Sequence, residues 1–134
     1  AVHDAARPLA TPQLIGSVVR RAELTGAAIP AVPVKDTVKV VRSGQVVSTP
    51  ERAALQAAQT PQVFLRLLLE TALSLDRGCT DDASAVEAMG VGVHTVPGSY
   101  ENLKITTPED LVLARAILER RVSCASATAT TSTG

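Results

Sequence analysis

Four Thr-Pro dipeptides divide this chain into segments, and they constrain its fold more than any other feature. They lie at Thr11-Pro12, Thr49-Pro50, Thr60-Pro61 and Thr107-Pro108. A threonine can accept a hydrogen bond from the free amides of a first helical turn, and a proline at the next position has a preset φ and no amide to leave unpaired. Each dipeptide therefore predicts the start of a helix.

Apolar runs between these starts predict the remaining elements. The segment 12–25 has one apolar stripe and is followed by Gly26, which is typical of a surface helix with a left-handed stop. Residues 27–34 are typical of a strand buried on both faces, and residues 37–49 of a β-hairpin that turns at Ser43-Gly44. The other expected elements are a short helix from Pro50, a longer, well-buried helix over 61–75, a helix over 80–90, a strand over 91–98 and a helix over 107–121. This alternation predicts an α/β fold with a largely parallel sheet.

The composition argues against several classes of partner. The formal net charge is zero, so nothing draws the whole chain toward nucleic acid or an anionic membrane. With one Phe, one Tyr and no Trp, the chain lacks the stacking surface of single-stranded nucleic-acid binders. No stretch approaches the roughly 20 apolar residues of a membrane span. Cys79 and Cys124 form no Cys-x-x-Cys pair, which argues against a zinc site or a disulfide framework and favours a reducing compartment. We expect neither nucleic acid nor a membrane as a partner.

Several polar stretches carry residue types that suit a phosphorylated ligand. Arginine forks across phosphate oxygens, lysine adds a point charge, and threonine hydroxyls donate further bonds. In an open α/β sheet such ligands bind beyond the carboxyl ends of strands. The candidates are Asp4 and Arg7 in "HDAARP", Lys35 to Thr37, Arg52, Thr60, Thr80 to Asp82, and Lys104 to Thr106.

Most of these residues also have a purely structural explanation. Thr60 is explained equally well as a helix cap, Asp81 and Asp82 as complements of a helix dipole, and Asp4 with Arg7 as a salt bridge within a turn. Arg52 is different, because a cation in the first turn of a helix opposes the dipole, and this misfit favours a functional role. On the residues alone, the sequence indicates an α/β domain that can bind a phosphate.

The order and spacing of five stretches indicate more. "VHDAARP", "PVKDTVK", "TPERAALQAAQTPQVF", "TDDASAVE" and "NLKITTPEDLVLA" resemble, in this order, the second half of the 2-C-methyl-D-erythritol 4-phosphate cytidylyltransferase family of the non-mevalonate isoprenoid pathway. The resemblance covers residues 1 to about 120. It implies a Rossmann-like nucleotidyltransferase fold, of the nucleotide-diphospho-sugar transferase type, with a projecting β-hairpin arm at about 33–56. We expect one domain over 1–121 and a disordered tail over 122–134.

The resemblance also implies an activity and a set of site residues. The family transfers a cytidylyl group from CTP to methylerythritol phosphate and releases pyrophosphate, with Mg²⁺ assisting. Lys104 and Arg52 match its catalytic positions, and an arm-mediated homodimer is implied, in which Thr37 and Arg52 complete the neighbour's site. The positions that match its substrate-binding residues are Asp4, Ala5, Arg7, Thr37, Arg52, Thr60, Thr80 and Lys104. A bacterial cytoplasm or a plastid stroma is the expected location.

One departure from the family pattern is large. The family begins with a strand and a glycine-rich loop that grip the CTP triphosphate, and residues 1–134 contain no Gly-x-Gly-x-Arg run. We therefore expect an N-terminally truncated form of the fold, the C-terminal portion of a larger enzyme, that does not turn over CTP alone. Two alternatives remain open: a non-catalytic dimerisation or substrate-binding module that acts with a partner chain, or another sugar-phosphate nucleotidyltransferase.

Overall fold

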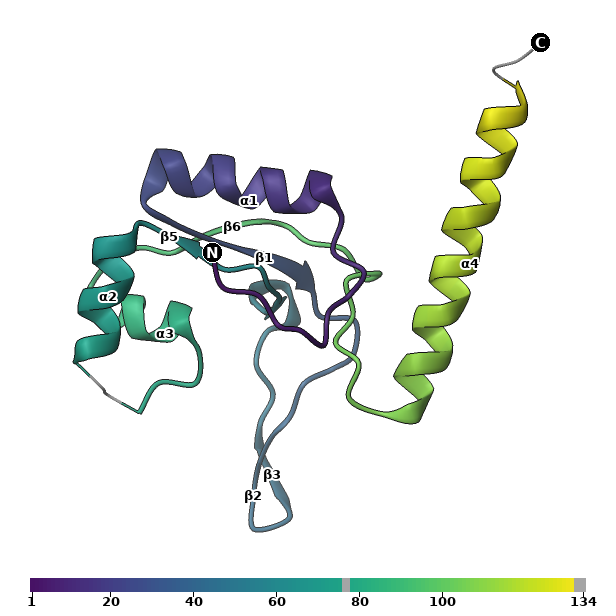
Figure 1. Ribbon diagram of the computed structural model, residues 1–134. Helices are drawn as coiled ribbons and strands as arrows, with labels where there is room; N and C mark the ends of the chain where they lie inside the picture. Colours follow the sequence, from purple (N-terminus) through teal and green to yellow (C-terminus); the bar gives the residue numbers. More distant parts are fainter. Residues whose placement is uncertain (76–77, 132–134) are drawn as a thin grey trace.

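A small mixed sheet lies at the centre of the computed structural model, which describes residues 1–75 and 78–131 (Figure 1). Strand β1 (Ala27–Pro33) pairs in parallel with β6 (His94–Pro97) and antiparallel with β4 (Gln56–Ala58) and β5 (Val63–Phe64). The α/β class is confirmed, but the expectation of a largely parallel sheet is wrong for the described residues. The chain returns from its hairpin directly beside β1, and such a return needs no crossover helix and gives an antiparallel neighbour.

Helix α1 (Pro12–Thr25) covers one face of this sheet, as the sequence predicts. Its first turn is capped by Thr11, whose hydroxyl accepts from the Leu14 amide at 3.2 Å, and Gly26 ends it with a φ of 90°. Val18 and Ala22 of the helix pack against Ala28 and Val96 of the sheet, together with Val63. This burial fixes the helix on the sheet, because aliphatic contact is the main stabilising term available to a chain with so few aromatic residues.

Helices α2 (Arg66–Ser74) and α3 (Asp82–Glu87) cover the other face. Successive residues of a strand point to opposite faces, so Ala27 and Ile29 meet this second layer while Ala28 meets α1. The second core is completed by Phe64, Ala72, Ala83, Ala85 and Val86. The site described below lies where this layer meets the N-terminal segment.

The predicted helix over 61–75 is partly wrong. Val63 and Phe64 form a strand because they pair with β1, and the helix begins only at Arg66. It is also less buried than expected, since Leu67 is 78% exposed and Leu73 is 52% exposed. Thr60-Pro61, which contains a cis peptide bond, is therefore not a helix start.

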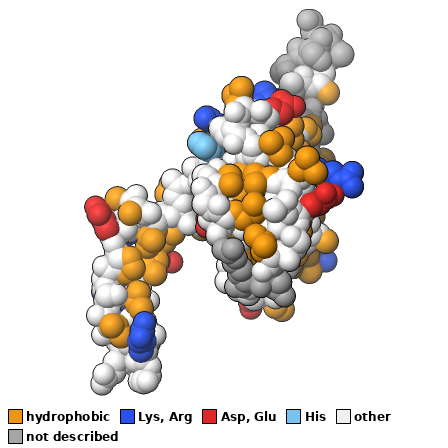
Figure 2. All heavy atoms as spheres, turned by 90° about the vertical axis from the view of Figure 1, so that its left-hand side faces the viewer, with side chains coloured by type: hydrophobic (Ala, Val, Ile, Leu, Met, Phe, Trp, Pro, Cys, Tyr) orange, Lys and Arg blue, Asp and Glu red, His pale blue; other side chains and the backbone are white. Residues whose placement is uncertain are grey.

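The hairpin forms a projecting arm, as predicted (Figure 1). Strands β2 (Val40–Arg42) and β3 (Gln45–Ser48) pair across a turn in which Ser43 and Gly44 have φ values of 49° and 75°, a conformation that favours glycine. Figure 2 shows hydrophobic side chains along the arm, among which are the exposed Val38, Val40, Val41, Val46 and Val47. The short helix expected from Pro50 is a 3-10 turn, η1 (Arg52–Ala54).

Helix α4 (Pro108–Thr131) stands beside the body and is longer than predicted (Figure 1). Thr107 and Asp110 cap it reciprocally, and Arg121 ties it to the body through the Leu9 carbonyl at 3.1 Å. The expectation of a disordered tail is wrong for 122–131, because extending an existing helix costs less than starting one and this stretch contains three alanines. Residues 132–134 lie outside the described residues. The described helices include none long and apolar enough to cross a membrane.

Candidate functional site

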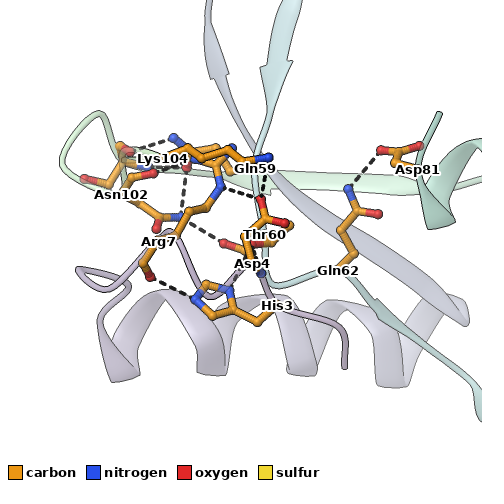
Figure 3. Close-up of polar contacts among 10 residues, drawn as sticks. His3, Asp4, Arg7, Gln59, Thr60, Gln62, Asp81, Asn102 and Lys104 are labelled. Atoms are coloured by element: carbon orange, nitrogen blue, oxygen red, sulfur yellow. Dashed lines mark hydrogen bonds and ion pairs between the residues drawn. The ribbon is translucent and has the colours of Figure 1, made fainter. Parts of the chain in front are cut away.

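A cleft of about 360 Å³ lies where four segments of the chain meet. The N-terminal segment contributes Asp4 and Arg7, the connection between β4 and β5 contributes Gln59, Thr60 and Gln62, and the stretch that begins α3 contributes Thr80, Asp81 and Asp82. Lys104, before α4, also lines it, as do Val2 and Ala58. The fold therefore brings together five of the predicted substrate-binding residues: Asp4, Arg7, Thr60, Thr80 and Lys104. Figure 3 shows four of them: Asp4, Arg7, Thr60 and Lys104.

Asp4 stands between the two cations of the cleft. Its Oδ2 atom lies 3.2 Å from Nε of Arg7 and 3.7 Å from Nζ of Lys104. One carboxylate thus faces two positive charges, and the Lys104 side chain is half-exposed at 49%. Asp4, Arg7 and Lys104 together keep one positive charge that an anionic ligand can neutralise, although Asp81 and Asp82 also line the cleft and add negative charge. Asp4 retains lone pairs that can accept from ligand hydroxyls.

Thr60 caps no helix, and its side chain instead joins two segments of the chain. Its hydroxyl oxygen accepts a hydrogen bond from the Asp4 amide at 3.0 Å, and lies 2.9 Å from Nδ1 of His3. The other ring nitrogen of His3, Nε2, lies 2.9 Å from the carbonyl oxygen of Arg7. A closed set of hydrogen bonds therefore links the N-terminal segment to the β4–β5 connection (Figure 3).

Two buried amide side chains, those of Gln59 and Asn102, form hydrogen bonds that position residues of the cleft. Gln59 is 5% exposed, and its amide both donates to the Ser99 carbonyl at 2.8 Å and accepts from the Ser99 amide at 3.2 Å. Asn102 is 1% exposed; its side chain donates to Thr60 and Gln59, and its main-chain carbonyl accepts from Nη1 of Arg7 at 2.7 Å. Sequence reasoning assigned neither residue a role, although both stand inside the motifs of the family resemblance.

The far wall of the cleft is built on Gln62 and Asp81. Gln62 donates to Oδ2 of Asp81 at 3.0 Å and accepts from the Ala83 amide at 3.1 Å. Asp81 caps α3 through the amide and hydroxyl of Ser84. Partial burial raises the pKa of Asp81, but the hydrogen bonds from Ser84 and Gln62 outweigh burial and hold this pKa below its ordinary value of 3.8. Asp81 therefore has a structural role, one of the two explanations that the sequence left open.

Three predicted site residues do not line this cleft. Ala5 is exposed and is not among the lining residues, and Thr37 is exposed at the root of the arm. Arg52 lines a separate hollow with Pro33, Val34, Ala53, Leu55 and Gln56, and its Nη1 atom donates to the Lys35 carbonyl at 3.0 Å. Lys35, one of the sequence candidates for a phosphorylated ligand, lies 3.9 Å from the centre of the Tyr100 ring.

Fold and cleft together define a class: a mixed α/β protein whose paired cations, threonine hydroxyls and Asp4 carboxylate suit a phosphorylated, hydroxyl-bearing ligand. The 2-C-methyl-D-erythritol 4-phosphate cytidylyltransferase family matches residues 1–120, and the chain belongs to this family. The resemblance given by the five motifs and the expected nucleotidyltransferase fold are confirmed.

Individual relatives agree with this assignment. The cytidylyltransferase of Bacillus thuringiensis (strain Al Hakam) is 54% identical over 121 residues, which are 87% of this chain and 54% of the relative. That of Rubrobacter xylanophilus is 54% identical over 126 residues, which are 90% of this chain and 54% of the relative. The crystal structure of the Thermus thermophilus enzyme superimposes with a TM-score of 0.80 at 38% identity, over 88% of this chain and 60% of that chain. The chain spans about half the length of the curated relatives it matches.

Proposed function

We propose that this protein takes part in cytidylyl transfer from CTP to 2-C-methyl-D-erythritol 4-phosphate, and that residues 1–134 carry the methylerythritol phosphate side of the site. The observation that carries the proposal is the convergence of Arg7, Lys104, Asp4 and Thr60 on one cleft. The family membership supports it, because the relatives are named as enzymes of this reaction.

The proposed reaction asks little covalent chemistry of the protein. A phosphate oxygen of methylerythritol phosphate attacks the α-phosphorus of CTP, a P–O bond forms, and the bond to pyrophosphate breaks. Positioning of two anions and neutralisation of their charge supply most of the rate in such transfers. Lys104 faces the reacting phosphates, Arg7 and Asp4 hold the acceptor, and Thr60 and Thr80 add hydroxyl contacts. In this arrangement Asp4 accepts hydrogen bonds from the hydroxyl groups of the acceptor.

The arm has a separate place in the proposal. We assign Thr37 and Arg52 to the site of a second copy of the chain in a homodimer, and Ala5 to a main-chain contact with the substrate. The projection of the arm and its exposed valines support this assignment, because apolar side chains on a projecting hairpin are stabilised when a partner covers them. Arg52, counted among the expected catalytic residues, would then act across the dimer.

The described residues do not form a ready-made metal site. Within residues 1–75 and 78–131, no group of three or more His, Cys, Asp or Glu side chains is placed to hold an ion. In the cleft, Asp4 faces Arg7 and Lys104, and Asp81 is occupied by Gln62 and Ser84. We propose that Mg²⁺ is carried by the phosphates of CTP, since this ion keeps several waters and commonly binds through substrate phosphates. We assign no residue to it.

The relatives named above are bacterial, which supports a bacterial cytoplasm over a plastid stroma as the proposed location. The residues that recognise CTP in the family are proposed to lie outside residues 1–134. We therefore expect turnover of CTP only in the protein isolated from its source. The CTP-binding residues can belong there to the same polypeptide or to a partner chain.

Two measurements test the proposal. We expect the protein isolated from its source to release pyrophosphate only when CTP and methylerythritol phosphate are both present, and an intact-mass determination then shows which polypeptide carries the activity. We expect the 134-residue chain to bind methylerythritol phosphate in a calorimeter without turning over CTP. Consumption of another nucleotide or another sugar phosphate by the source protein, with no response to this pair, would overturn the assignment.

A further inference from the structure

The hydroxyl of Thr60 is held by partners that compete for its single proton. A hydroxyl group has one proton to donate and two lone pairs that accept. One lone pair receives the Asp4 amide proton at 3.0 Å. The second neighbour is Nδ1 of His3, at 2.9 Å, and a ring nitrogen can donate or accept. The direction of the Thr60–His3 bond therefore decides what Thr60 offers to a ligand in the cleft.

The other end of the imidazole fixes the tautomer. Nε2 of His3 lies 2.9 Å from the carbonyl oxygen of Arg7, and a carbonyl oxygen can only accept. Nε2 must therefore carry a proton in both charge states. In neutral His3, Nδ1 has no proton, so Thr60 must donate to it. When His3 is neutral, the Thr60 hydroxyl therefore donates its hydrogen bond to His3, and only a lone pair of this hydroxyl remains for a ligand.

Protonation of His3 reverses this bond. With a proton on Nδ1, the ring donates to the Thr60 oxygen, and the Asp4 amide fills the second lone pair. The Thr60 proton is then released and can be donated into the cleft. Phosphate oxygens are strong acceptors, so the form of the site that best receives a phosphate through Thr60 is the one with His3 charged.

We propose that His3 is a positioning residue whose protonation turns the Thr60 hydroxyl into a donor, so that binding of a phosphate in the cleft takes up a proton at His3. The inference rests on the proposed function, in which Thr60 contacts the phosphorylated acceptor. His3 itself is not assigned a ligand contact, because both of its ring nitrogens are used by Thr60 and Arg7. Histidine suits the role because its charge changes between about pH 5 and 8.

The charges around His3 permit the switch. Asp4 is adjacent in the chain and attracts a positive imidazole, while Arg7 and Lys104 oppose it and are both paired with Asp4. Across the cleft, Asp81 and Asp82 add negative charge. A bound phosphate adds anionic charge in the cleft next to Thr60, the hydrogen-bond partner of the imidazole, and this charge favours the charged ring over the neutral one.

The test is a ¹⁵N NMR titration of the imidazole nitrogens in the 134-residue chain, with and without methylerythritol phosphate, and separately with inorganic phosphate. In the ligand-free chain the neutral form of His3 should carry its proton on Nε2, and added ligand should shift the ring toward the doubly protonated form. His94, an exposed residue of β6 outside the cleft, is the internal control and should not respond.

Binding measured by calorimetry gives a second readout. Between pH 6.5 and 8 the affinity for methylerythritol phosphate should fall with rising pH, by at most tenfold per pH unit, the limit for one linked proton. The second ionisation of the ligand phosphate, near pH 6, acts in the opposite direction. Thr60→Ser should keep the fall, whereas Thr60→Val should abolish it and also abolish the response of the His3 signals.

Each outcome separates this inference from the proposed function. Binding of methylerythritol phosphate with unchanged His3 signals overturns the role of His3 and leaves the proposed function standing. A response of His3 to inorganic phosphate without any binding of methylerythritol phosphate supports the role of His3 and overturns the proposed substrate. Failure of both ligands to bind between pH 6.5 and 8 overturns both.

Discussion

The side-chain amide nitrogen of Asn102 lies 2.9 Å from the main-chain carbonyl oxygen of Thr60. The same nitrogen lies 3.3 Å from Oε1 of Gln59, and the orientation of the Gln59 amide is fixed by its two bonds to Ser99. The Thr60 carbonyl oxygen and Oε1 of Gln59 are both acceptors, so the Asn102 atom that faces them must be the amide nitrogen. This fixes the orientation of the Asn102 side-chain amide. A buried side chain outside the cleft thus sets the backbone position of a residue inside it.

Replacing Asn102 by leucine, which is similar in size but has no donors, should destabilise the protein. The Thr60 carbonyl would lose its buried side-chain donor, at a cost of about 1–3 kcal/mol, while the Gln59 oxygen would lose one of two donors and keep the Ser99 amide. Urea denaturation followed by circular dichroism measures the loss. Gln13→Leu, a change of an exposed amide on α1, is the matched control and should stay within about 0.5 kcal/mol of the parent. Equal losses in the two variants would contradict the role given to Asn102.

The capping carboxylate of Asp81 should make stability depend on pH in the acid range. Burial raises its pKa, hydrogen bonds from Ser84 and Gln62 lower it further than burial raises it, and the folded value lies below the ordinary 3.8. A group with a depressed folded pKa stabilises the fold above its unfolded pKa, and this contribution is lost as the pH falls through the folded value. The free energy of unfolding should therefore decrease as the pH is lowered from about 5.

Asp81→Asn isolates that contribution. Asparagine can keep the cap to Ser84 through its oxygen, but its amide nitrogen cannot accept from Gln62, so we expect a loss of about 1–3 kcal/mol at pH 7. The decline in stability between pH 5 and 3 should become shallower, because the titrating carboxylate is gone. Urea denaturation at several pH values measures both quantities. Asp36→Asn, which removes a negative charge from the exposed root of the arm, is the control. A decline as steep in Asp81→Asn as in the parent would show that the pH dependence arises elsewhere.

Caps and turn residues in the sequence correctly predicted helix α1 and the hairpin. Thr11 caps α1 and Gly26 ends it, and Ser43-Gly44 makes the hairpin turn, because each depends on a few neighbouring backbone groups. Thr60-Pro61 carries the same signal as Thr11-Pro12 but begins no helix, since pairing of the following residues with β1 outweighs the local preference. The sheet's antiparallel strands were missed for the same reason.

In the candidate site, too, the sequence revealed some residues and not others. Asp4, Arg7 and Lys104 were found because charged side chains in turns are visible in a sequence, and they do converge on one cleft. Gln59 and Asn102 were not assigned, because an amide becomes important only when the fold buries it against particular carbonyls. Whether Thr37 and Arg52 reach a partner's cleft depends on a second chain, which no pattern within one chain can place.

Tyr100 should hold the start of the arm, near Pro33 and Lys35, in place against the body. Its hydroxyl donates to the Pro33 carbonyl at 2.7 Å, and its ring lies under Lys35. Tyr100→Ala removes both interactions, together worth roughly 1–2 kcal/mol at an exposed position, and should speed tryptic cleavage after Lys35 and Lys39 severalfold. Mass spectrometry of the early fragments measures the rate. Tyr100→Phe keeps the ring and should show a smaller effect; an unchanged rate in Tyr100→Ala would contradict the anchor.

The fork of Arg7 should be required for the phosphorylated ligand. Nε is bound to Asp4 and Nη1 to the Asn102 carbonyl, so the guanidinium is held by two partners at fixed angles. Lysine keeps the charge but cannot make both bonds, and it offers a single point donor. Arg7→Lys should weaken binding of methylerythritol phosphate by about 1.5–3 kcal/mol, which is roughly tenfold to a hundredfold in Kd, as measured by calorimetry. Arg20→Lys, the same change at an exposed position on α1, should leave Kd unchanged. Equal affinities in Arg7→Lys and in the parent would mean that charge alone, without the geometry set by Asp4 and Asn102, accounts for binding in the cleft.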